Sequence, residues 1–295
     1  MIGYLFLSIA LTAGATKAYC GKKMGSFAAN TQSAVLINII RMSLCTVFGL
    51  LLILFNNNIS FLTLDKRFLL ISFVSGVSTS LFVVTWLLAV KKSAYMMVDV
   101  FLMLGAMVPM ITGFFAFAEP ITTKQWIGYG ILIIATLIMC SYNNSIKAKL
   151  SLSTLAFLTL SGLSNGITDF SQKWFVKEFP QIPASVFNLY TYIFAALALL
   201  IYYVITLKKE KPQFEDGTKH KYTYIFIMAA ALITNSLFKT KAAMFLDSAQ
   251  LYPLNQGMSL IIASLVAAAL FKEKLTLKCI AGIILAFAGL IIMNC

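Results

Sequence analysis

The sequence is poor in charged residues and in the residue types on which most catalytic and metal sites depend. Of its 295 residues only 11% are charged, and His220 is the single histidine. One histidine excludes any site that needs two imidazole ligands, and the five cysteines form no CxxC pair. We therefore expect no enzyme, no metal site and no resident cofactor.

Apolar residues are what the sequence has in excess. They make up 60% of the chain, and the mean hydropathy is +0.89. Soluble domains carry about 25% charged residues, so this composition indicates a multi-pass integral protein of the cell membrane. About 20 helical residues span a bilayer. Ten apolar runs of suitable length lie at residues 2–19, 31–55, 68–90, 94–117, 125–141, 151–171, 184–207, 222–245, 249–271 and 277–294.

The basic residues lie mostly between these runs. The formal net charge is +13, and this distribution is typical of loops against anionic headgroups and not of a nucleic-acid site. Ten spans place both termini on one side, where we count seven Lys and Arg, among them Lys173 and Lys239, against fourteen on the other side. The positive-inside rule then predicts that both termini are outside.

An internal repeat organises the chain. Residues 119–139 match residues 273–293 at a constant offset of 154, which aligns Glu119 with Glu273 and Gly128 with Gly282. The first five helices therefore repeat as the last five, giving one unit at residues 1–145 and a second at residues 146–295. Because five is odd, the second copy is inverted in the membrane. The predicted fold class is all-α, with ten transmembrane helices in two inverted five-helix repeats.

This pattern resembles the drug/metabolite transporter superfamily, specifically its EamA-type members. The features that carry the resemblance are the two aligned acids and the glycine nine positions after each of them, Gly128 and Gly282. The resemblance covers about residues 3–293. It implies that the first four helices of each half surround a central cavity and that the protein transports a solute. It also implies cytoplasmic termini, which disagrees with the charge count, and both alternatives stay open here.

Polar residues inside the apolar runs are the candidates for binding this solute, because charges and amides are tolerated there when they face a cavity or a partner. Four of them are ionisable: Arg41, Asp99, Asp169 and Lys239. Asp99 and Asp169 are also the candidate proton carriers. The remaining cavity candidates are amide, hydroxyl and aromatic side chains: Asn38, Thr79, Trp86, Tyr95, Asn165, Asn235, Asn255 and Gln256.

Other features have structural interpretations. Glu119 and Glu273 end their helices, where a role in capping is expected, and we assign them with Gly128 and Gly282 to the repeat motif. Ser8, Thr12 and Thr16 form a polar stripe at helical spacing, which indicates either a cavity face or hydrogen bonds to the helix backbone. Pro109 and Pro253 predict kinks in their helices.

The sequence favours a secondary transporter that moves a small zwitterionic or anionic metabolite, such as an amino acid, outward by alternating access. An uptake permease for a sugar or a nucleobase is the alternative, and a channel or a non-transporting scaffold is the alternative of another class. The expected partners are the solute and the lipid bilayer, with no nucleic acid. Proton coupling, and whether the protein is a monomer or a homodimer, are left open.

Overall fold

The structure is a computed structural model, and it describes residues 1–25, 27–92, 95–140, 152–208, 210–214, 220–271 and 276–294. These residues form α-helices and one short 3-10 helix, η1, with no β-strand among them. The helices are α1 (Ile2–Gly25), α2 (Thr31–Phe55), η1 (Ile59–Phe61), α3 (Lys66–Lys92), α4 (Tyr95–Gly105), α5 (Met107–Phe117), α6 (Thr123–Cys140), α7 (Leu152–Glu178), α8 (Ala184–Thr206), α9 (Lys221–Ala243), α10 (Ser248–Phe271) and α11 (Leu277–Asn294).

Most helices follow the apolar runs of the sequence closely, and two differences have physical causes. The predicted helix at 94–117 is broken into α4 and α5 at Ala106. Pro109 has no N–H to bond the carbonyl of Gly105, four residues earlier, and its ring crowds that carbonyl, so the break falls just before it. In contrast, α10 continues as one helix through Pro253. Helix α7 extends to Glu178, past the predicted end at residue 171, because its last polar residues find buried partners.

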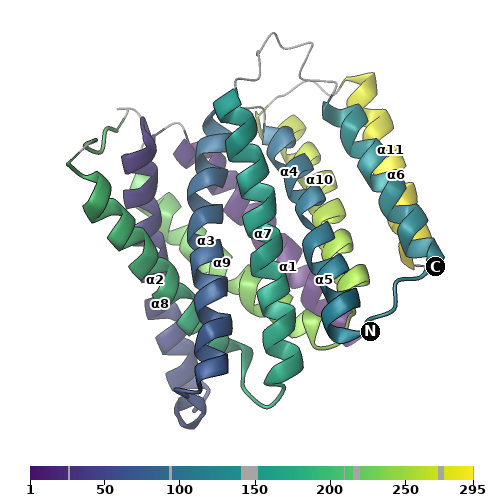
Figure 1. The fold of residues 1–295 in the computed structure, drawn as a ribbon. Helices are drawn as coiled ribbons and strands as arrows, with labels where there is room; N and C mark the ends of the chain where they lie inside the picture. The colour runs from purple at the N-terminus through teal and green to yellow at the C-terminus, as the bar shows by residue number, and fades with distance from the viewer. Residues whose placement is uncertain are drawn as a thin grey trace.

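The helices pack in a bundle in which the first and second halves of the chain interleave (Figure 1). Helix α1 packs against α9, α3 against α7, α2 against α8 and α6 against α11, while α4 lies between α7 and α10. Figure 1 shows α6 and α11 side by side at one edge of the bundle, and the marks for both chain ends toward its lower end. Below, "lower" and "upper" refer to this view.

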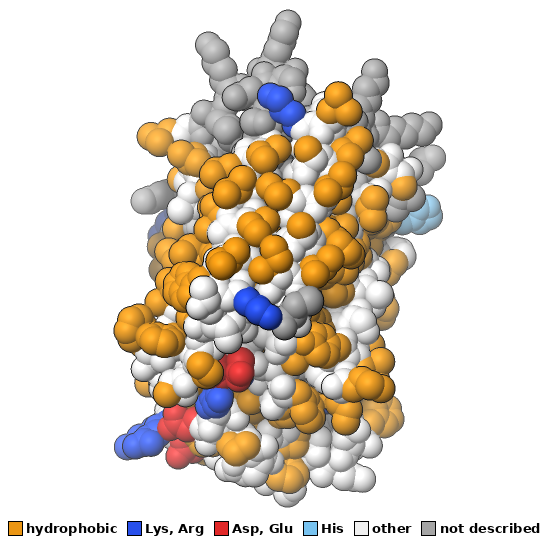
Figure 2. All heavy atoms as spheres, turned by 90° about the vertical axis from the view of Figure 1, so that its right-hand side faces the viewer, with side chains coloured by type: hydrophobic (Ala, Val, Ile, Leu, Met, Phe, Trp, Pro, Cys, Tyr) orange, Lys and Arg blue, Asp and Glu red, His pale blue; other side chains and the backbone are white. Residues whose placement is uncertain are grey.

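The helices carry the apolar surface of an integral membrane protein. Within the part of the chain that the structure describes, four helices are long and apolar enough to cross a membrane by length and composition, at Thr31–Phe55, Lys66–Val90, Ala184–Thr206 and Lys221–Ala243. Shorter apolar helices lie at Phe101–Phe117, Thr123–Ile138 and Ile280–Asn294. Figure 2 shows hydrophobic side chains over most of the face that includes α6 and α11, with the acidic side chains near its lower end.

Glycines set the closest helix contacts. A Cβ at Gly162 of α7 would lie 2.2 Å from the carbonyl oxygen of Phe101, and one at Gly105 of α4 would lie 2.1 Å from that of Gly162. In α6, a Cβ at Gly128 would lie 2.2 Å from Met293 Cγ and 2.6 Å from the carbonyl oxygen of Gly289. Small residues at these crossings let the backbones touch, which stabilises helix pairs in a membrane through van der Waals packing.

Two sequence-based interpretations change with the fold. The Ser8, Thr12 and Thr16 hydroxyls are exposed on α1 and donate to backbone carbonyls of their own helix, so this stripe does not face the interior. Lys173 and Lys239, counted above among the seven basic residues of the terminal side, are buried in the bundle at 2% and 6% exposure. These two lysines therefore contribute little to the surface charge of the terminal side.

Candidate functional site

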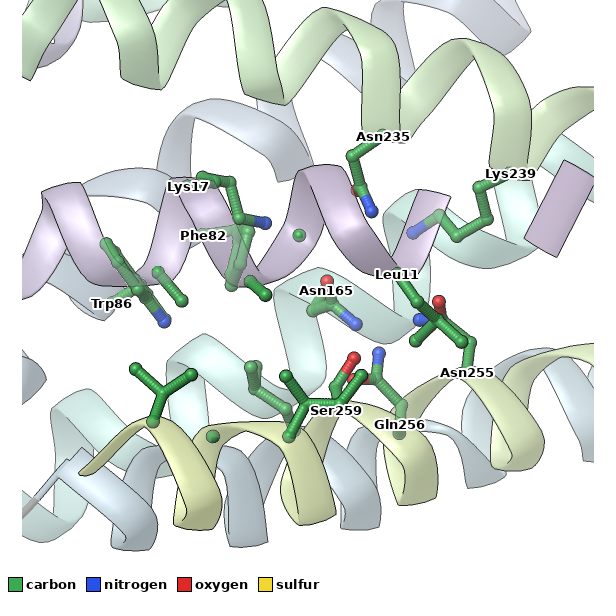
Figure 3. Close-up of a pocket in the computed structure, with 17 residues that line it drawn as sticks. Leu11, Lys17, Phe82, Trp86, Asn165, Asn235, Lys239, Asn255, Gln256 and Ser259 are labelled. Atoms are coloured by element: carbon green, nitrogen blue, oxygen red, sulfur yellow. The ribbon is translucent and has the colours of Figure 1, made fainter. Parts of the chain in front are cut away.

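A polar cavity of about 60 Å³ lies inside the bundle, between α1, α3, α4, α7, α9 and α10. By volume it has room for roughly four to six water-sized groups. Figure 3 shows that Asn165 of α7 and Asn235 and Lys239 of α9 extend toward a common space, with Asn255 and Gln256 of α10 on the facing wall. Lys17, Phe82 and Trp86 lie toward the other end of the cavity.

A buried ion pair forms the lower wall of the cavity. The Lys239 ammonium of α9 donates to Asp169 Oδ1 of α7, and Asp169 is fully buried. Asn165, one turn earlier on α7, donates from Nδ2 to Asp169 Oδ2 at 3.3 Å. Tyr252 of α10 donates from its hydroxyl to the backbone carbonyl of Asp169 at 2.7 Å. Three helices therefore meet at Asp169.

Two asparagines complete the polar wall in different ways. Asn235 Nδ2 donates to the backbone carbonyl of Ala10 at 2.7 Å, which fixes the side chain between α9 and α1. Asn255 is 5% exposed, and its Oδ1 has no hydrogen-bond partner among the described residues. A buried amide oxygen without a partner carries a desolvation cost, so it is well suited to accept a hydrogen bond from a solute.

The upper end of the cavity is aromatic. Trp86 and Phe82 of α3 are 4% and 6% exposed, and Lys17 Nζ lies 5.6 Å from the centre of the Phe82 ring. The Trp86 indole packs directly on Gly21 of α1, where a Cβ would lie 2.1 Å from the ring. Large aromatic surfaces with few polar groups are typical of the walls of small-molecule sites.

A second ionic cluster closes the bundle below the cavity. Glu119 Oε1 lies 2.8 Å from Lys173 Nζ and 3.0 Å from Lys177 Nζ, and its Oε2 accepts from the Ser248 N–H at 2.8 Å. Lys173 Nζ also donates to the carbonyls of Ala243 and Leu246, at 3.2 and 2.7 Å. The carboxylate thus caps the start of α10, and the ammonium caps the end of α9.

This geometry sets the charge state of Glu119. Burial alone raises the pKa of the carboxyl, but the hydrogen bonds from Lys173 and Ser248 outweigh it, so the net pKa lies below its usual range. The carboxylate is therefore ionised at neutral pH. Its repeat equivalent, Glu273, lies outside the described residues.

The structure brings together only part of the predicted set. Seven of the candidates lie at or directly behind the cavity wall. Six line it, namely Trp86, Asn165, Asn235, Lys239, Asn255 and Gln256, and Asp169 lies behind Lys239. Thr79 is not among the lining residues; it lies in the α3–α7 contact, with its hydroxyl 3.4 Å from that of Thr168. Tyr95 and Asp99 belong to α4, but their side chains are outside the part that the structure describes.

Asn38 and Arg41 also lie away from this cavity, on α2. Asn38 Nδ2 donates to the carbonyls of Ala34 and Val83, at 2.8 and 3.3 Å. Arg41 is 1% exposed, lies near Tyr192, and has no partner for Nε and Nη1 among the described residues. Both side chains are buried inside the bundle, as we expect of polar residues within an apolar run. They lie in contacts of α2 with other helices and not at the cavity.

Sequence reasoning missed the apolar part of the site and one local pattern. Leu11, Leu102 and Ile262 line the cavity, and nothing in their local sequence separates them from ordinary core residues. The segment 162–166 reads GLSNG, which fits the GxSxG pattern of serine hydrolases. Here it lies within α7 and not at a strand-to-helix turn, and the Ser164 hydroxyl donates to the carbonyl of Leu160. It therefore lacks the geometry of a nucleophile.

The described residues suit binding better than catalysis or metal ligation. No group of three or more His, Cys, Asp or Glu side chains in the described ranges could hold a metal ion. The cavity offers one ion pair, several amides and an aromatic wall, which recognise a small polar solute by charge and hydrogen bonding.

Comparison with known proteins agrees with this picture. No curated protein matches the chain, but 28 chains of known structure do. One of them, described only as "Crystal structure of protein", has a TM-score of 0.75 and 12% sequence identity, and the match covers 98% of this chain and 95% of that one. At this identity the likeness shows the fold alone.

The match to a protein family bears on function as well as on fold. Residues 152–295 match the EamA-like transporter family, and members of this family are transporters rather than enzymes. Together with the apolar helices, this match indicates an integral membrane protein. The second half of the chain, residues 152–295, is thus similar to the EamA-like transporter family, which confirms the resemblance to the drug/metabolite transporter superfamily and supports a membrane transporter.

Proposed function

We propose that the protein is a secondary transporter of the cell membrane that carries a small polar metabolite, zwitterionic or anionic, through the cavity described above. The observation that carries the proposal is the convergence of Asn165, Asn235 and Lys239 on one enclosed space inside an apolar bundle. Polar groups in hydrocarbon are costly, so their clustering around a cavity favours a solute pathway over a purely structural role.

We propose further that the chain crosses the membrane ten times, as two inverted five-helix units at residues 1–145 and 146–295. If α4 and α5 count as one span, the repeat aligns α1 with α7, α2 with α8, α3 with α9 and α6 with α11. The main helix contacts are the same when the two halves are exchanged. The contact of α1 with α9 corresponds to that of α7 with α3, and the contacts α2–α8 and α6–α11 each join a helix to its own repeat equivalent. Such a pseudo-twofold arrangement supports alternating access, because two equivalent halves can exchange conformations.

The candidate solute site in this proposal comprises the six lining residues Trp86, Asn165, Asn235, Lys239, Asn255 and Gln256, with Asp169 behind them. Asp169 is the proposed proton carrier if transport is proton-coupled, since its only charged partner among the described residues at hydrogen-bond distance is Lys239. The proposed direction is outward, as expected from the sequence.

Counterflow in proteoliposomes tests the proposal. The purified full chain is reconstituted with unlabelled metabolite inside, and uptake of the same labelled metabolite is followed. A carrier exchanges the two, so internal solute accelerates uptake of the label. If no member of a broad panel of amino acids, organic acids, sugars and nucleobases shows such acceleration, the protein is a channel or a scaffold and the proposal is wrong.

A further inference from the structure

We propose that Lys239 recognises the acidic group of the solute and that Asp169 positions Lys239 for this contact. This inference rests on the proposed function, and it narrows the solute to small carboxylates that carry a hydrogen-bond donor near the carboxylate. Three observations support it: the donors that Lys239 has left, the position of Asp169 behind the wall, and the unpartnered oxygen of Asn255.

The Lys239 ammonium has N–H donors that no described residue uses. An ammonium group has three N–H donors, and within the described ranges Lys239 donates to one acceptor, Asp169 Oδ1. Its side chain lines the cavity and extends into it in Figure 3. An ammonium that is held by one carboxylate and faces an enclosed polar space attracts a second anionic oxygen, which a solute can supply.

Asp169 does not face the solute. Its side chain is 0% exposed and is not part of the cavity lining. Its two oxygens accept from Lys239 and from Asn165, so this one carboxylate orients a cation from α9 and an amide from α7 toward the cavity. We therefore assign Asp169 as a positioning residue and not as the partner of a solute ammonium.

Asn255 supplies the complementary acceptor. Its Oδ1 is buried in the facing wall and has no partner among the described residues, whereas Lys239 offers only donors. A solute that satisfies both carries a carboxylate and, close to it, an N–H or O–H group. The volume of about 60 Å³ suits a molecule of roughly the size of alanine or lactate.

The probe for this inference is labelled alanine, compared with two analogues of similar size. Alaninamide lacks the carboxylate, and propionate lacks the donor. In counterflow with the wild-type protein we expect alanine to exchange, and expect each analogue to compete at least tenfold more weakly. Competition by alaninamide equal to that by alanine would overturn the role of Lys239, and equal competition by propionate would overturn the role of Asn255.

The main variant removes both charges of the pair, so that it leaves no unpaired charge buried. The double variant K239M/D169N is neutral at both positions, and K239R keeps the cation. The matched control is K241M, two residues further along α9, because Lys241 lies over the Phe6 and Phe238 rings and does not line the cavity. Thermal unfolding of each purified variant shows whether it is folded.

We expect the folded double variant to need at least tenfold more alanine for half-maximal exchange and to lose the preference for alanine over alaninamide. We expect K239R to keep this preference, and K241M to behave as the wild type. D169N alone leaves the Lys239 ammonium without its carboxylate partner. If this variant folds, it should lose part of the preference for alanine over alaninamide, which a merely structural role would not produce. A folded double variant that still prefers alanine would overturn the assignment.

Failure of this inference is distinguishable from failure of the proposed function. If wild-type protein exchanges a sugar or a nucleobase of the panel but no amino acid and no organic acid, the carboxylate assignment is wrong and the transport proposal stands. If it exchanges nothing in the panel, the proposed function itself fails.

Discussion

Arg41 is a buried cation whose surroundings agree poorly with its charge. Its side chain is 1% exposed, and its Nε and Nη1 have no hydrogen-bond partner among the described residues. A buried charge without a partner costs several kcal/mol. Residues of similar volume without the charge should therefore suit this position in α2 at least as well.

We predict that Arg41→Met does not lower the melting temperature of the purified protein. A rise would correspond to a gain in the free energy of unfolding of about 1 kcal/mol or more. Arg67→Met is the control, since the Arg67 side chain is 81% exposed and its ion pair with Glu178 should contribute under about 1 kcal/mol. A clearly lower melting temperature for Arg41→Met alone would show that the guanidinium has a stabilising partner in the folded protein.

Glu119 is the opposite case, a buried charge with several partners. Because its pKa in the folded protein is lowered, its ionised form stabilises the fold above the pKa of the unfolded chain, and this contribution is lost as the pH falls through the folded-state pKa. We predict that Glu119→Gln lowers stability by about 3 kcal/mol at pH 7 and that the difference from wild type shrinks at low pH. Thermal unfolding between pH 7 and pH 3 measures this. A difference that does not change with pH would show that charge is not the cause.

The contact between α6 and α11 depends on the absence of a side chain at one position. Gly128 has no room for a Cβ, whereas a Cβ at Gly130, two residues further along α6, would meet nothing within 4 Å. The two glycines therefore form a matched pair within one helix.

We predict that Gly128→Ala destabilises the protein, because the helices must move apart, by about 1–3 kcal/mol as in other overpacked contacts. Gly130→Ala should be neutral or stabilising by up to about 1 kcal/mol, since alanine is the better helix former. Melting temperatures of the two variants, measured in the same detergent, test this. Equal effects of the two substitutions would contradict the close contact.

Helix positions could be predicted from the sequence because spans are set by apolar length. The end of α7 could not, because Gln172 and Lys173 are polar in sequence but find partners in Ser236 and in the carbonyls of Ala243 and Leu246. The sequence predicted a kink at Pro109, and the structure has a break at Ala106, three residues earlier. The break precedes the proline because Pro109 cannot bond the carbonyl of Gly105 and crowds it.

The same limit applies to the candidate site. Asn165, Asn235 and Asn255 were predicted to face a cavity, and the structure brings them together around one. Asn38 was predicted on the same grounds and lies elsewhere. Polarity inside an apolar run predicts that a residue is buried, but which helix it faces is set by packing between segments far apart in the chain.

At the scale of the whole molecule, the proposed transport by alternating access requires the cavity to open in turn to the two sides of the membrane. In this structure the lower end is closed by the pair of Asp169 with Lys239 and, below it, by the cluster of Glu119 with Lys173. Alternating access requires this end to open in a second conformation, so a residue of the cavity wall must be reachable from both sides.

The most direct test is a single cysteine at Asn255 in a variant whose five natural cysteines are replaced. A charged, membrane-impermeant thiol reagent is added to right-side-out or inside-out vesicles, and the rate of labelling is measured. A cysteine at Leu158, which is 0% exposed, is the unlabelled control. The account predicts that Asn255→Cys is labelled from both sides. Labelling from one side only, or from neither, would contradict it.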